Sequence, residues 1–122
     1  MLNTNVVELN AFVPAKDFEV SKRFCLDLGF EIPWFDETLA YVRFQNASFM
    51  LQNFFLKDHR ENFVMHLLVE SADDWHKALE SKGIAEAYNI SINSPEDRPW
   101  KMRDFEMVDP SGVLWRIGNN FD

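Results

Sequence analysis

The sequence predicts an α+β fold in which two βαβββ modules form a single domain covering residues 1–122. The order strand, capped helix, glycine and three strands occurs twice, at about residues 6–56 and 62–120. The distance from helix cap to glycine is twelve residues in both halves. No linker rich in Gly, Pro or Ser separates the halves, and one such module cannot cover its own sheet. We therefore expect the two modules to pack together and to leave a cleft.

Two helices are predicted from capping signals. Asp17 and Ser71 can each accept hydrogen bonds from the free N–H groups of a first helical turn. Gly29 and Gly83 follow the last turns, where a left-handed conformation is common. The expected helices cover about 18–28 and 72–82. Their apolar faces would be formed by Val20, Phe24 and Leu28 in the first helix, and by Trp75, Ala78 and Leu79 in the second.

Runs rich in β-branched and aromatic residues predict the strands of both modules. The expected strands are 6–13, 30–35, 39–45 and 47–55, followed by 63–70, 84–91, 102–108 and 113–118. Tight connections are expected at residues 46–47 and at the type I turn sequence DPSG, residues 109–112. The polar segments 57–62 and 93–99 are expected to be loops.

Composition and charge exclude several functions. A formal net charge of −8 disfavours binding to phosphate backbones, so we expect no nucleic-acid partner. No apolar run is long enough to cross a membrane, and the N-terminus lacks the pattern of a secretory signal. Cys25 is the only cysteine and cannot form an internal disulfide. A reducing, cytoplasmic location is therefore expected, with Cys25 as an inert core residue.

Three stretches resemble one known superfamily. PAKDFEVSKRFCLDLGFE (14–31) and VDPSGVLWRI (108–117) look like the first strand-to-helix passage and the final hairpin of the vicinal oxygen chelate superfamily. This superfamily includes glyoxalase I, extradiol dioxygenases and bleomycin-resistance proteins. DRPWKMRDFEMVDPSG (97–112) resembles the tryptophan-containing stretch of the bleomycin-resistance group. That resemblance implies a homodimer formed by arm exchange, with two interfacial pockets.

The same resemblance implies that Trp100 lines the ligand cleft and stacks on planar rings. Two departures from the group's pattern concern the loop and turn around it. Lys101 and Met102 stand where the group has a Gly-containing link, so we expect a loop that adopts positive φ less readily. Val113 replaces the usual Asn of the final turn. Both departures concern the ligand rather than the fold.

The metal positions implied by the resemblance fall on Asn10, Gln52, Val64 and Arg116. Val64 has no ligand atom and Arg116 would repel a cation, so we predict no metal, no cofactor and no catalytic residue. The sequence thus favours a metal-independent protein that sequesters a small molecule. The alternative is a metal-dependent lyase, isomerase or dioxygenase whose ligands are shifted in the alignment. A scaffold or interaction module without a small ligand is a third hypothesis.

The candidate ligand-binding residues combine aromatic rings with nearby charges, which suits a planar, partly cationic aromatic ligand. Trp75 and Trp115 are assigned to packing instead. Arg116 would oppose a cationic ligand unless Asp104 or Glu106 neutralises it, and it would suit a carboxylate. Strand alternation places Phe12, Met50 and Phe54 on faces that could line the cleft. The alternative is that these side chains form the core beneath the sheet. The full set is Phe12, Trp34, Phe35, Asp36, Met50, Gln52, Phe54, His66, Trp100 and Arg116.

Overall fold

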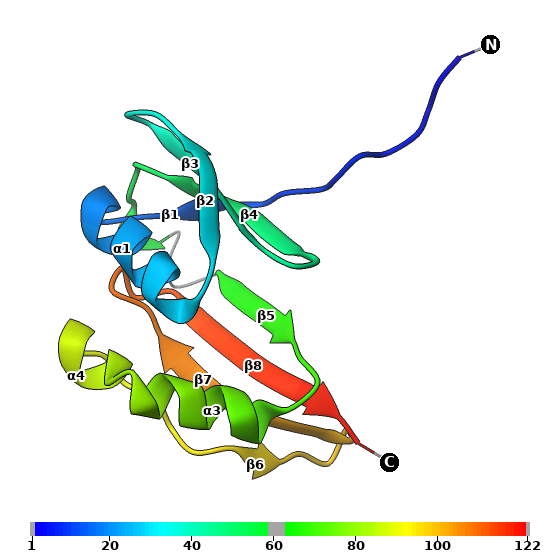
Figure 1. Ribbon diagram of the computed structural model, residues 1–122, viewed down its shortest axis with the longest axis vertical. Helices are drawn as coiled ribbons and strands as arrows, with labels where there is room; N and C mark the ends of the chain where they lie inside the picture. Colours follow the sequence, from blue (N-terminus) through cyan, green and yellow to red (C-terminus); the bar gives the residue numbers. More distant parts are fainter. Residues whose placement is uncertain (1, 59–62, 122) are drawn as a thin grey trace.

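Two four-stranded sheets with helices on one face of each make up the computed structural model, which describes residues 2–58 and 63–121 (Figure 1). Sheet A has the order β1-β4-β3-β2 and sheet B the order β5-β8-β7-β6. The pairs β1–β4 and β5–β8 are parallel, and the other neighbouring strands are antiparallel. The elements of the first module are β1 (Phe12–Pro14), α1 (Phe18–Leu28), β2 (Glu31–Phe35), β3 (Leu39–Phe44) and β4 (Ala47–Gln52). Those of the second are β5 (Val64–Leu68), α3 (Ala72–Ser81), α4 (Ile84–Tyr88), β6 (Glu96–Asp97), β7 (Met102–Val108) and β8 (Leu114–Asn120). The predicted α+β fold of two βαβββ modules is confirmed.

The two predicted helices form where the capping signals placed them. The Asp17 carboxylate accepts from the Val20 amide at 3.1 Å, and Gly29 follows α1 with φ of 109°. The Ser71 hydroxyl accepts from the Asp74 amide at 3.1 Å. No helix in the described residues is both long and apolar enough to span a bilayer.

The predicted strand at 84–91 is wrong, because Ile84–Tyr88 forms the short helix α4. Gly83 has a left-handed φ of 65° that redirects the chain, and the Ala-Glu-Ala sequence favours a helix. The Tyr88 ring packs edge-on against Phe24, with ring centroids 5.1 Å apart. The edge of sheet B is occupied instead by β6, which lies within the predicted loop 93–99.

Smaller corrections concern the hairpin and the segment after it. Gln45 and Asn46 form the β3–β4 turn, because Phe44 pairs directly with Ala47. The strand predicted at 47–55 ends at Gln52, since the chain turns there and the Phe54 amide donates to the Gln52 carbonyl. Residues 57–58 are helical rather than a loop, and residues 59–62 lie outside the described residues.

Only the end of the predicted strand at 6–13 is a strand, since β1 begins at Phe12 and pairs with β4. Residues 2–10, which we call the N-terminal arm, extend away from the body of the molecule (Figure 1). The arm is extended without being part of a sheet because, among residues 2–58 and 63–121, no strand lies beside its backbone. Its Val6 and Val7 side chains are 84% and 98% exposed.

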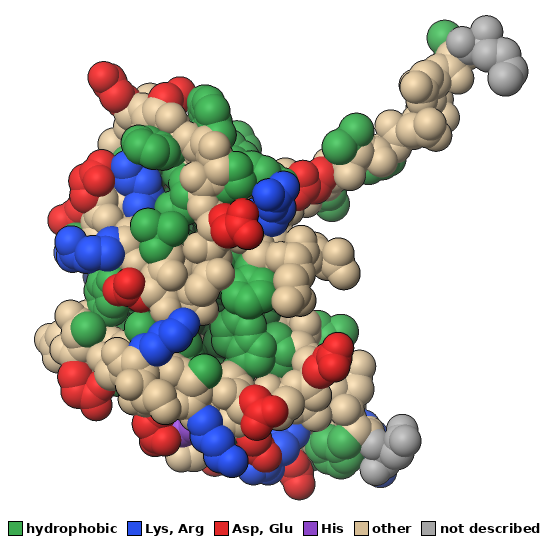
Figure 2. Space-filling model, in the orientation of Figure 1, with side chains coloured by type: hydrophobic (Ala, Val, Ile, Leu, Met, Phe, Trp, Pro, Cys, Tyr) green, Lys and Arg blue, Asp and Glu red, His purple; other side chains and the backbone are tan. Residues whose placement is uncertain are grey.

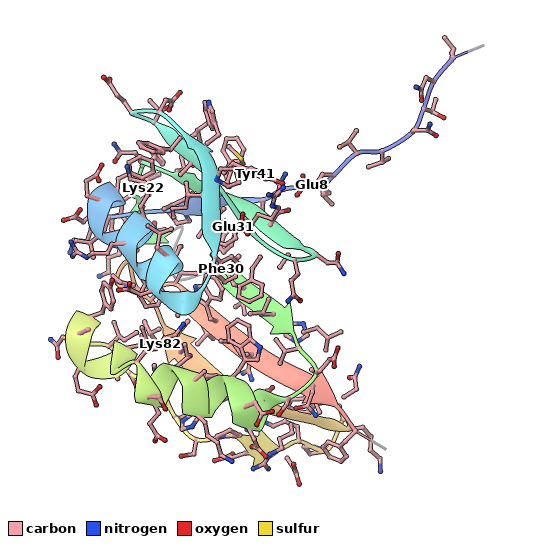
Figure 3. The ribbon with its side chains drawn as sticks, viewed as in Figure 1. Glu8, Lys22, Phe30, Glu31, Tyr41 and Lys82 are labelled. Atoms are coloured by element: carbon pink, nitrogen blue, oxygen red, sulfur yellow. The ribbon has the colours of Figure 1, made fainter. Side chains whose placement is uncertain are left out.

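Aromatic rings join the two modules on the side that carries the helices. Phe30, which lies where the modules meet (Figure 3), and Phe49 contact Trp115 edge-on, at centroid distances of 6.1 and 5.7 Å. Trp115 is buried, as its predicted packing role requires. Cys25 is also buried, and burial raises the pKa of its thiol. A raised pKa leaves the thiol protonated and unreactive.

The DPSG turn between β7 and β8 is built around a buried carboxylate. Asp109 Oδ1 accepts from the amides of Ser111 and Val113, both at 2.9 Å, and Oδ2 accepts from Trp115 Nε1 at 3.2 Å. Burial raises the pKa of Asp109, despite these hydrogen bonds. The Ser111 hydroxyl in turn accepts from the Lys16 amide at 2.8 Å, so this turn also fastens the second module to the first.

Candidate functional site

The outer face of sheet A, opposite α1, carries an apolar row that crosses all of its strands. Phe12, Met50, Tyr41 and Trp34 are direct cross-strand partners from β1 to β2. Phe12 is 50% exposed and Trp34 is 49% exposed. Side chains this large usually contribute to a core or to an interaction site. The row is therefore the strongest candidate for a ligand-binding surface.

The centre of the outer face of sheet B is polar. His66, Arg116 and Glu106 are direct cross-strand partners on β5, β8 and β7. Arg116 Nη2 lies 3.2 Å from Glu106 Oε1, and Nη1 lies 3.6 Å from Asp104 Oδ2. Both acids considered from the sequence as partners of Arg116 thus pair with it. Arg116 is not an isolated cation on this face.

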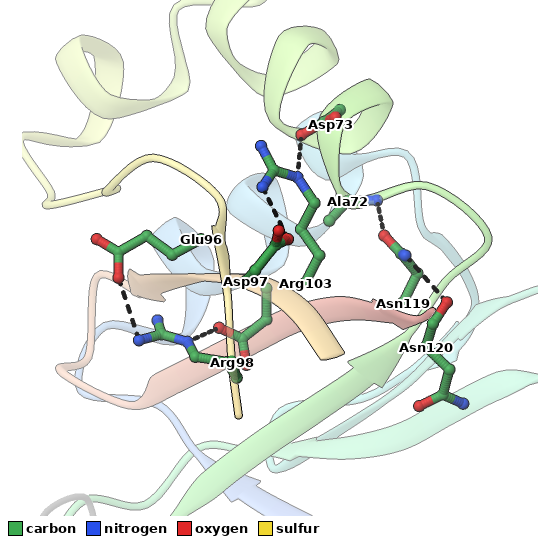
Figure 4. Close-up of polar contacts among 9 residues, drawn as sticks. Ala72, Asp73, Glu96, Asp97, Arg98, Arg103, Asn119 and Asn120 are labelled. Atoms are coloured by element: carbon green, nitrogen blue, oxygen red, sulfur yellow. Dashed lines mark hydrogen bonds and ion pairs between the residues drawn. The ribbon is translucent and has the colours of Figure 1, made fainter. Parts of the chain in front are cut away.

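A second guanidinium extends this charge network toward β6. Arg98 Nε donates to Asp104 Oδ1 at 2.8 Å, and Arg98 Nη1 donates to Glu96 Oε2 at 3.2 Å (Figure 4). The network therefore contains two guanidiniums, from Arg98 and Arg116, and three carboxylates, from Glu96, Asp104 and Glu106. Its formal charge is −1, so the face suits a cationic group better than an anionic one.

Trp100 lies at the tip of the loop between β6 and β7 and is 60% exposed. The Arg98 amide donates to the Met102 carbonyl at 2.7 Å, and the Lys101 amide donates to the Arg98 carbonyl at 3.2 Å. Lys101 has φ of 65°, so the loop is a three-residue hairpin whose last residue is left-handed. The sequence predicts that a loop with Lys101 adopts positive φ less readily than one with glycine, yet Lys101 itself adopts it. A side chain occupies the position that favours glycine.

Replacing Lys101 with glycine should leave the free energy of unfolding unchanged or raise it by up to about 1 kcal/mol. Relief of the left-handed conformation outweighs the greater chain entropy of glycine in the unfolded state. Lys101→Val should lower it by about 1 kcal/mol or more. Lys101→Gln removes the charge without relieving the backbone and serves as control. Urea denaturation measures all three, and a glycine variant as unstable as the valine variant would contradict the prediction.

Two of the predicted site residues, Phe35 and Asp36, are used by the fold. The Phe35 ring lies 4.2 Å from Lys22 Nζ on the α1 side of β2, so it faces away from Trp34. Asp36 Oδ1 accepts from the amides of Thr38 and Leu39 at 2.8 and 2.9 Å. These bonds lower the pKa of Asp36 and hold the β2–β3 turn. The structure therefore does not bring either residue together with the apolar row.

The other predicted residues lie on or near the two outer faces. Gln52 lies two residues after Met50 on β4, so both side chains are on the outer face of sheet A. His66 is exposed on β5. Phe54 lies two residues beyond β4 and is 46% exposed.

Tyr41 and Glu8 lie in or beside the apolar row and were not predicted as site residues from the sequence. Tyr41 lies within it and donates a hydrogen bond to the carboxylate of Glu8 on the arm, at 2.7 Å from Oε2 (Figure 3). Hydrogen bonds from Ser48 and Tyr41 lower the pKa of Glu8. Strict alternation along 39–45 could have identified Tyr41, but nothing local in the sequence indicates the contact with Glu8.

Two cavities lie away from Trp34 and Trp100. One, of about 360 Å³, opens between the arm, β4 and β5, and Glu8 and His66 help to line it. The other, of about 430 Å³, lies between the modules on the helical side, where Figure 2 shows a hollow with a hydrophobic floor. Trp75 lines it beside Phe44, at a ring distance of 5.6 Å. Phe12, Tyr41, Met50 and Trp34 line neither cavity, so the apolar row is an open surface in a single chain, whereas His66 of the outer face of sheet B lines the first cavity.

The residues at the implied metal positions do not fit a divalent ion. Val64 offers no ligand atom, and Arg116 is held in ion pairs with Asp104 and Glu106. Within residues 2–58 and 63–121, no three His, Cys, Asp or Glu side chains gather as a ligand set. The Asn10 Oδ1 atom is buried without a hydrogen-bond partner in the same part of the chain.

Comparison with solved structures identifies the fold. The structure matches a bleomycin-binding protein complexed with bleomycin, with a TM-score of 0.81, 23% identity and coverage of 95% of this chain and 100% of that chain. It matches a bleomycin resistance determinant encoded on the transposon Tn5 with a TM-score of 0.79 and 21% identity, over 94% and 98% of the chains. It matches TnmS3, an antibiotic-binding protein from Streptomyces sp. CB03234, with a TM-score of 0.76 and 19% identity, over 98% and 100%. No family model and no curated protein matches the sequence.

The chain therefore has the same fold as these three proteins, and this agrees with the fold that the sequence resemblance implied.

Proposed function

We propose that the protein is a metal-independent binding protein that encloses a planar, cationic aromatic molecule. The apolar row Phe12–Met50–Tyr41–Trp34 carries this proposal, because it offers a flat, half-exposed aromatic surface. Aromatic faces stack on planar rings and attract cations. The formal charge of −1 on the outer face of sheet B supports the same ligand class. Similarity of fold to bleomycin-binding proteins adds support, and bleomycin is accordingly the first ligand to test.

We also propose that two copies of the chain form the cleft, with sheet A of one protomer opposite sheet B of its partner. Both outer faces are open in a single chain, where Val64 and Leu68 on sheet B are 53% and 58% exposed. The N-terminal arm supports a dimer as well, since Val7 and Leu9 are 98% and 90% exposed. An apolar arm without a neighbouring strand gains hydrogen bonds and burial when it lies on a second copy.

Calorimetric titration with bleomycin and with proflavine, a small planar cation, tests the proposal. We expect saturable binding near one ligand per subunit. Trp34→Ala should weaken it at least about tenfold, which corresponds to about 1.4 kcal/mol. Phe35→Ala is the matched control, because Phe35 is the next residue on β2, is 58% exposed and faces the opposite side. Trp100→Ala tests the loop in the same way.

Three results would overturn the proposal. The first is equal loss of affinity in Trp34→Ala and Phe35→Ala, and the second is the absence of saturable binding to either ligand. The third is a stoichiometric divalent metal in protein purified without a His tag, because that would indicate a metal-dependent enzyme. Metal analysis of the untagged protein is therefore run on the same sample.

A further inference from the structure

Asp104 lies at the centre of the polar outer face of sheet B, yet it is only 2% exposed. Its neighbour Phe105 points to the other side and contacts His76 of α3. The cross-strand partner of Asp104 is Gly118. A Cβ atom on Gly118 would lie 2.6 Å from the Asp104 Cβ, so glycine is required for this close approach. A buried carboxylate at an outer face needs compensating partners.

Asp104 connects two cations that belong to different parts of the fold. Its Oδ1 accepts from Arg98 Nε at 2.8 Å, and its Oδ2 lies 3.6 Å from Arg116 Nη1. Arg98 begins the loop that carries Trp100 and forms both of the hydrogen bonds that close it. Arg116 stands at the middle of the face, beside His66. One buried carboxylate therefore joins the Trp100 loop to the charged centre of the face.

Asp104 fixes the positions of its two partners, Arg98 and Arg116. The side chain of Arg98 is 19% exposed, and the hydrogen bond to Asp104 raises the pKa of Arg98, so this guanidinium stays charged. Charge-assisted hydrogen bonds of this kind fix geometry as well as charge. Without Asp104, the Arg98 side chain would lose its hydrogen bond to β7, and Arg116 would keep only Glu106 among its ion pairs in the described residues.

We propose that Asp104 is a positioning residue that selects the charge of the ligand. It holds the Trp100 loop in place through Arg98, and it withholds the positive charge of Arg116 from the ligand. The cleft consequently favours planar cations over planar carboxylates. This inference rests on the proposed function, and it deepens that function by assigning the selectivity to the carboxylates that pair with Arg116, of which Asp104 also holds the loop.

The test compares two planar probes of opposite charge, proflavine and 2-naphthoate, by calorimetry. Asp104→Asn keeps the size of the side chain and one acceptor oxygen but removes the charge. We expect weaker proflavine binding, tighter 2-naphthoate binding and a change of about tenfold or more in the ratio of the two dissociation constants. A merely structural role would weaken both probes and leave their ratio unchanged.

Asp97→Asn is the matched control. Asp97 lies on β6 and pairs with Arg103 at 3.0 Å, and Arg103 also pairs with Asp73 of α3 (Figure 4). This substitution removes the same charge from a neighbouring ion pair that does not involve Arg98 or Arg116. We expect no change in the ratio. An equal change in both variants would overturn the proposal, because the effect would then come from net charge alone.

A second measurement examines the loop without a ligand. Trypsin can cleave after Lys101, which is exposed in the Trp100 loop. Asp104→Asn should speed this cleavage several-fold relative to wild type and to Asp97→Asn, as followed by mass spectrometry. An unchanged rate would overturn the role of Asp104 in holding the loop. This outcome does not depend on ligand binding, so it separates failure of the inference from failure of the proposed function.

Glu106→Gln covers the case in which Asp104→Asn does not fold. The Glu106 side chain is 34% exposed and lies 3.2 Å from Arg116, so its loss should leave the fold intact. It should shift the ratio of dissociation constants toward 2-naphthoate, in the same direction as Asp104→Asn. A folded Glu106→Gln protein with an unchanged ratio would overturn the assignment of charge selectivity to the partners of Arg116.

Discussion

Replacing Asp109 with alanine is expected to lower the free energy of unfolding by about 4 kcal/mol. The substitution leaves the amides of Ser111 and Val113 and the indole N–H of Trp115 without their acceptor in a buried turn. The turn also carries the hydrogen bond that links Ser111 to Lys16 of the first module. Urea denaturation followed by circular dichroism measures the loss. A loss below about 1 kcal/mol would contradict the prediction.

Asp109→Asn is the control for this prediction and also isolates the charge. Its oxygen can still accept from the two amides, so the expected loss is smaller, about 1–2 kcal/mol. Burial raises the pKa of Asp109 above its ordinary value of 3.8, so the folded state binds more protons than the unfolded state between these two values. The contribution of Asp109 to stability should therefore fall as pH rises through this window. The Asn variant should lack that slope, and an equal slope in both proteins would contradict the assignment.

Gly118→Ala is expected to lower the free energy of unfolding by about 3 kcal/mol. The new methyl group would lie 2.6 Å from the Asp104 Cβ and 2.9 Å from the Arg103 carbonyl oxygen, so β7 and β8 would have to separate. Gly83→Ala is the control, because Gly83 has positive φ but its nearest neighbour lies 3.8 Å away. Its loss should be only about 1 kcal/mol. Thermal unfolding of both variants measures the two losses of stability. If crowding at Gly118 is the cause, the Gly118→Ala protein must lose more stability than the Gly83→Ala protein.

The parts of the fold that depend on local signals were predictable from the sequence. Asp17 and Ser71 cap the helices through contacts three residues away, so a short stretch contains the whole signal. Tertiary structure decided the elements that were predicted wrongly. The segment 84–91 has strand-forming residues, yet the edge of sheet B is closed by β6 and the segment packs as a helix against Phe24.

The N-terminal arm is a second segment whose structure the local sequence predicted wrongly. Its composition favours a strand, but a strand forms only where a neighbouring strand supplies partners for its backbone. No such neighbour exists for residues 2–10 within the described chain, so β1 is confined to Phe12–Pro14.

The candidate site was predictable where strand alternation governs it. Alternation placed Phe12 and Met50 on a shared face, and the register joins them to Trp34. Sequence proximity misled the grouping of Phe35 with Trp34, because adjacent strand residues point to opposite faces. The ion pairs of Arg98 could not be predicted, since they depend on how the loop of Trp100 folds back on β7.

The proposed cleft between two copies would make ligand capture depend on the abundance of the protein. If each cleft needs two copies, the concentration of competent clefts rises with the square of protein concentration below the dimer dissociation constant, and linearly above it. A dilute sample would then capture almost nothing, even though each chain is correctly folded. Titrations at successive dilutions should reveal this threshold, and a cell could switch sequestration on through a modest increase in expression.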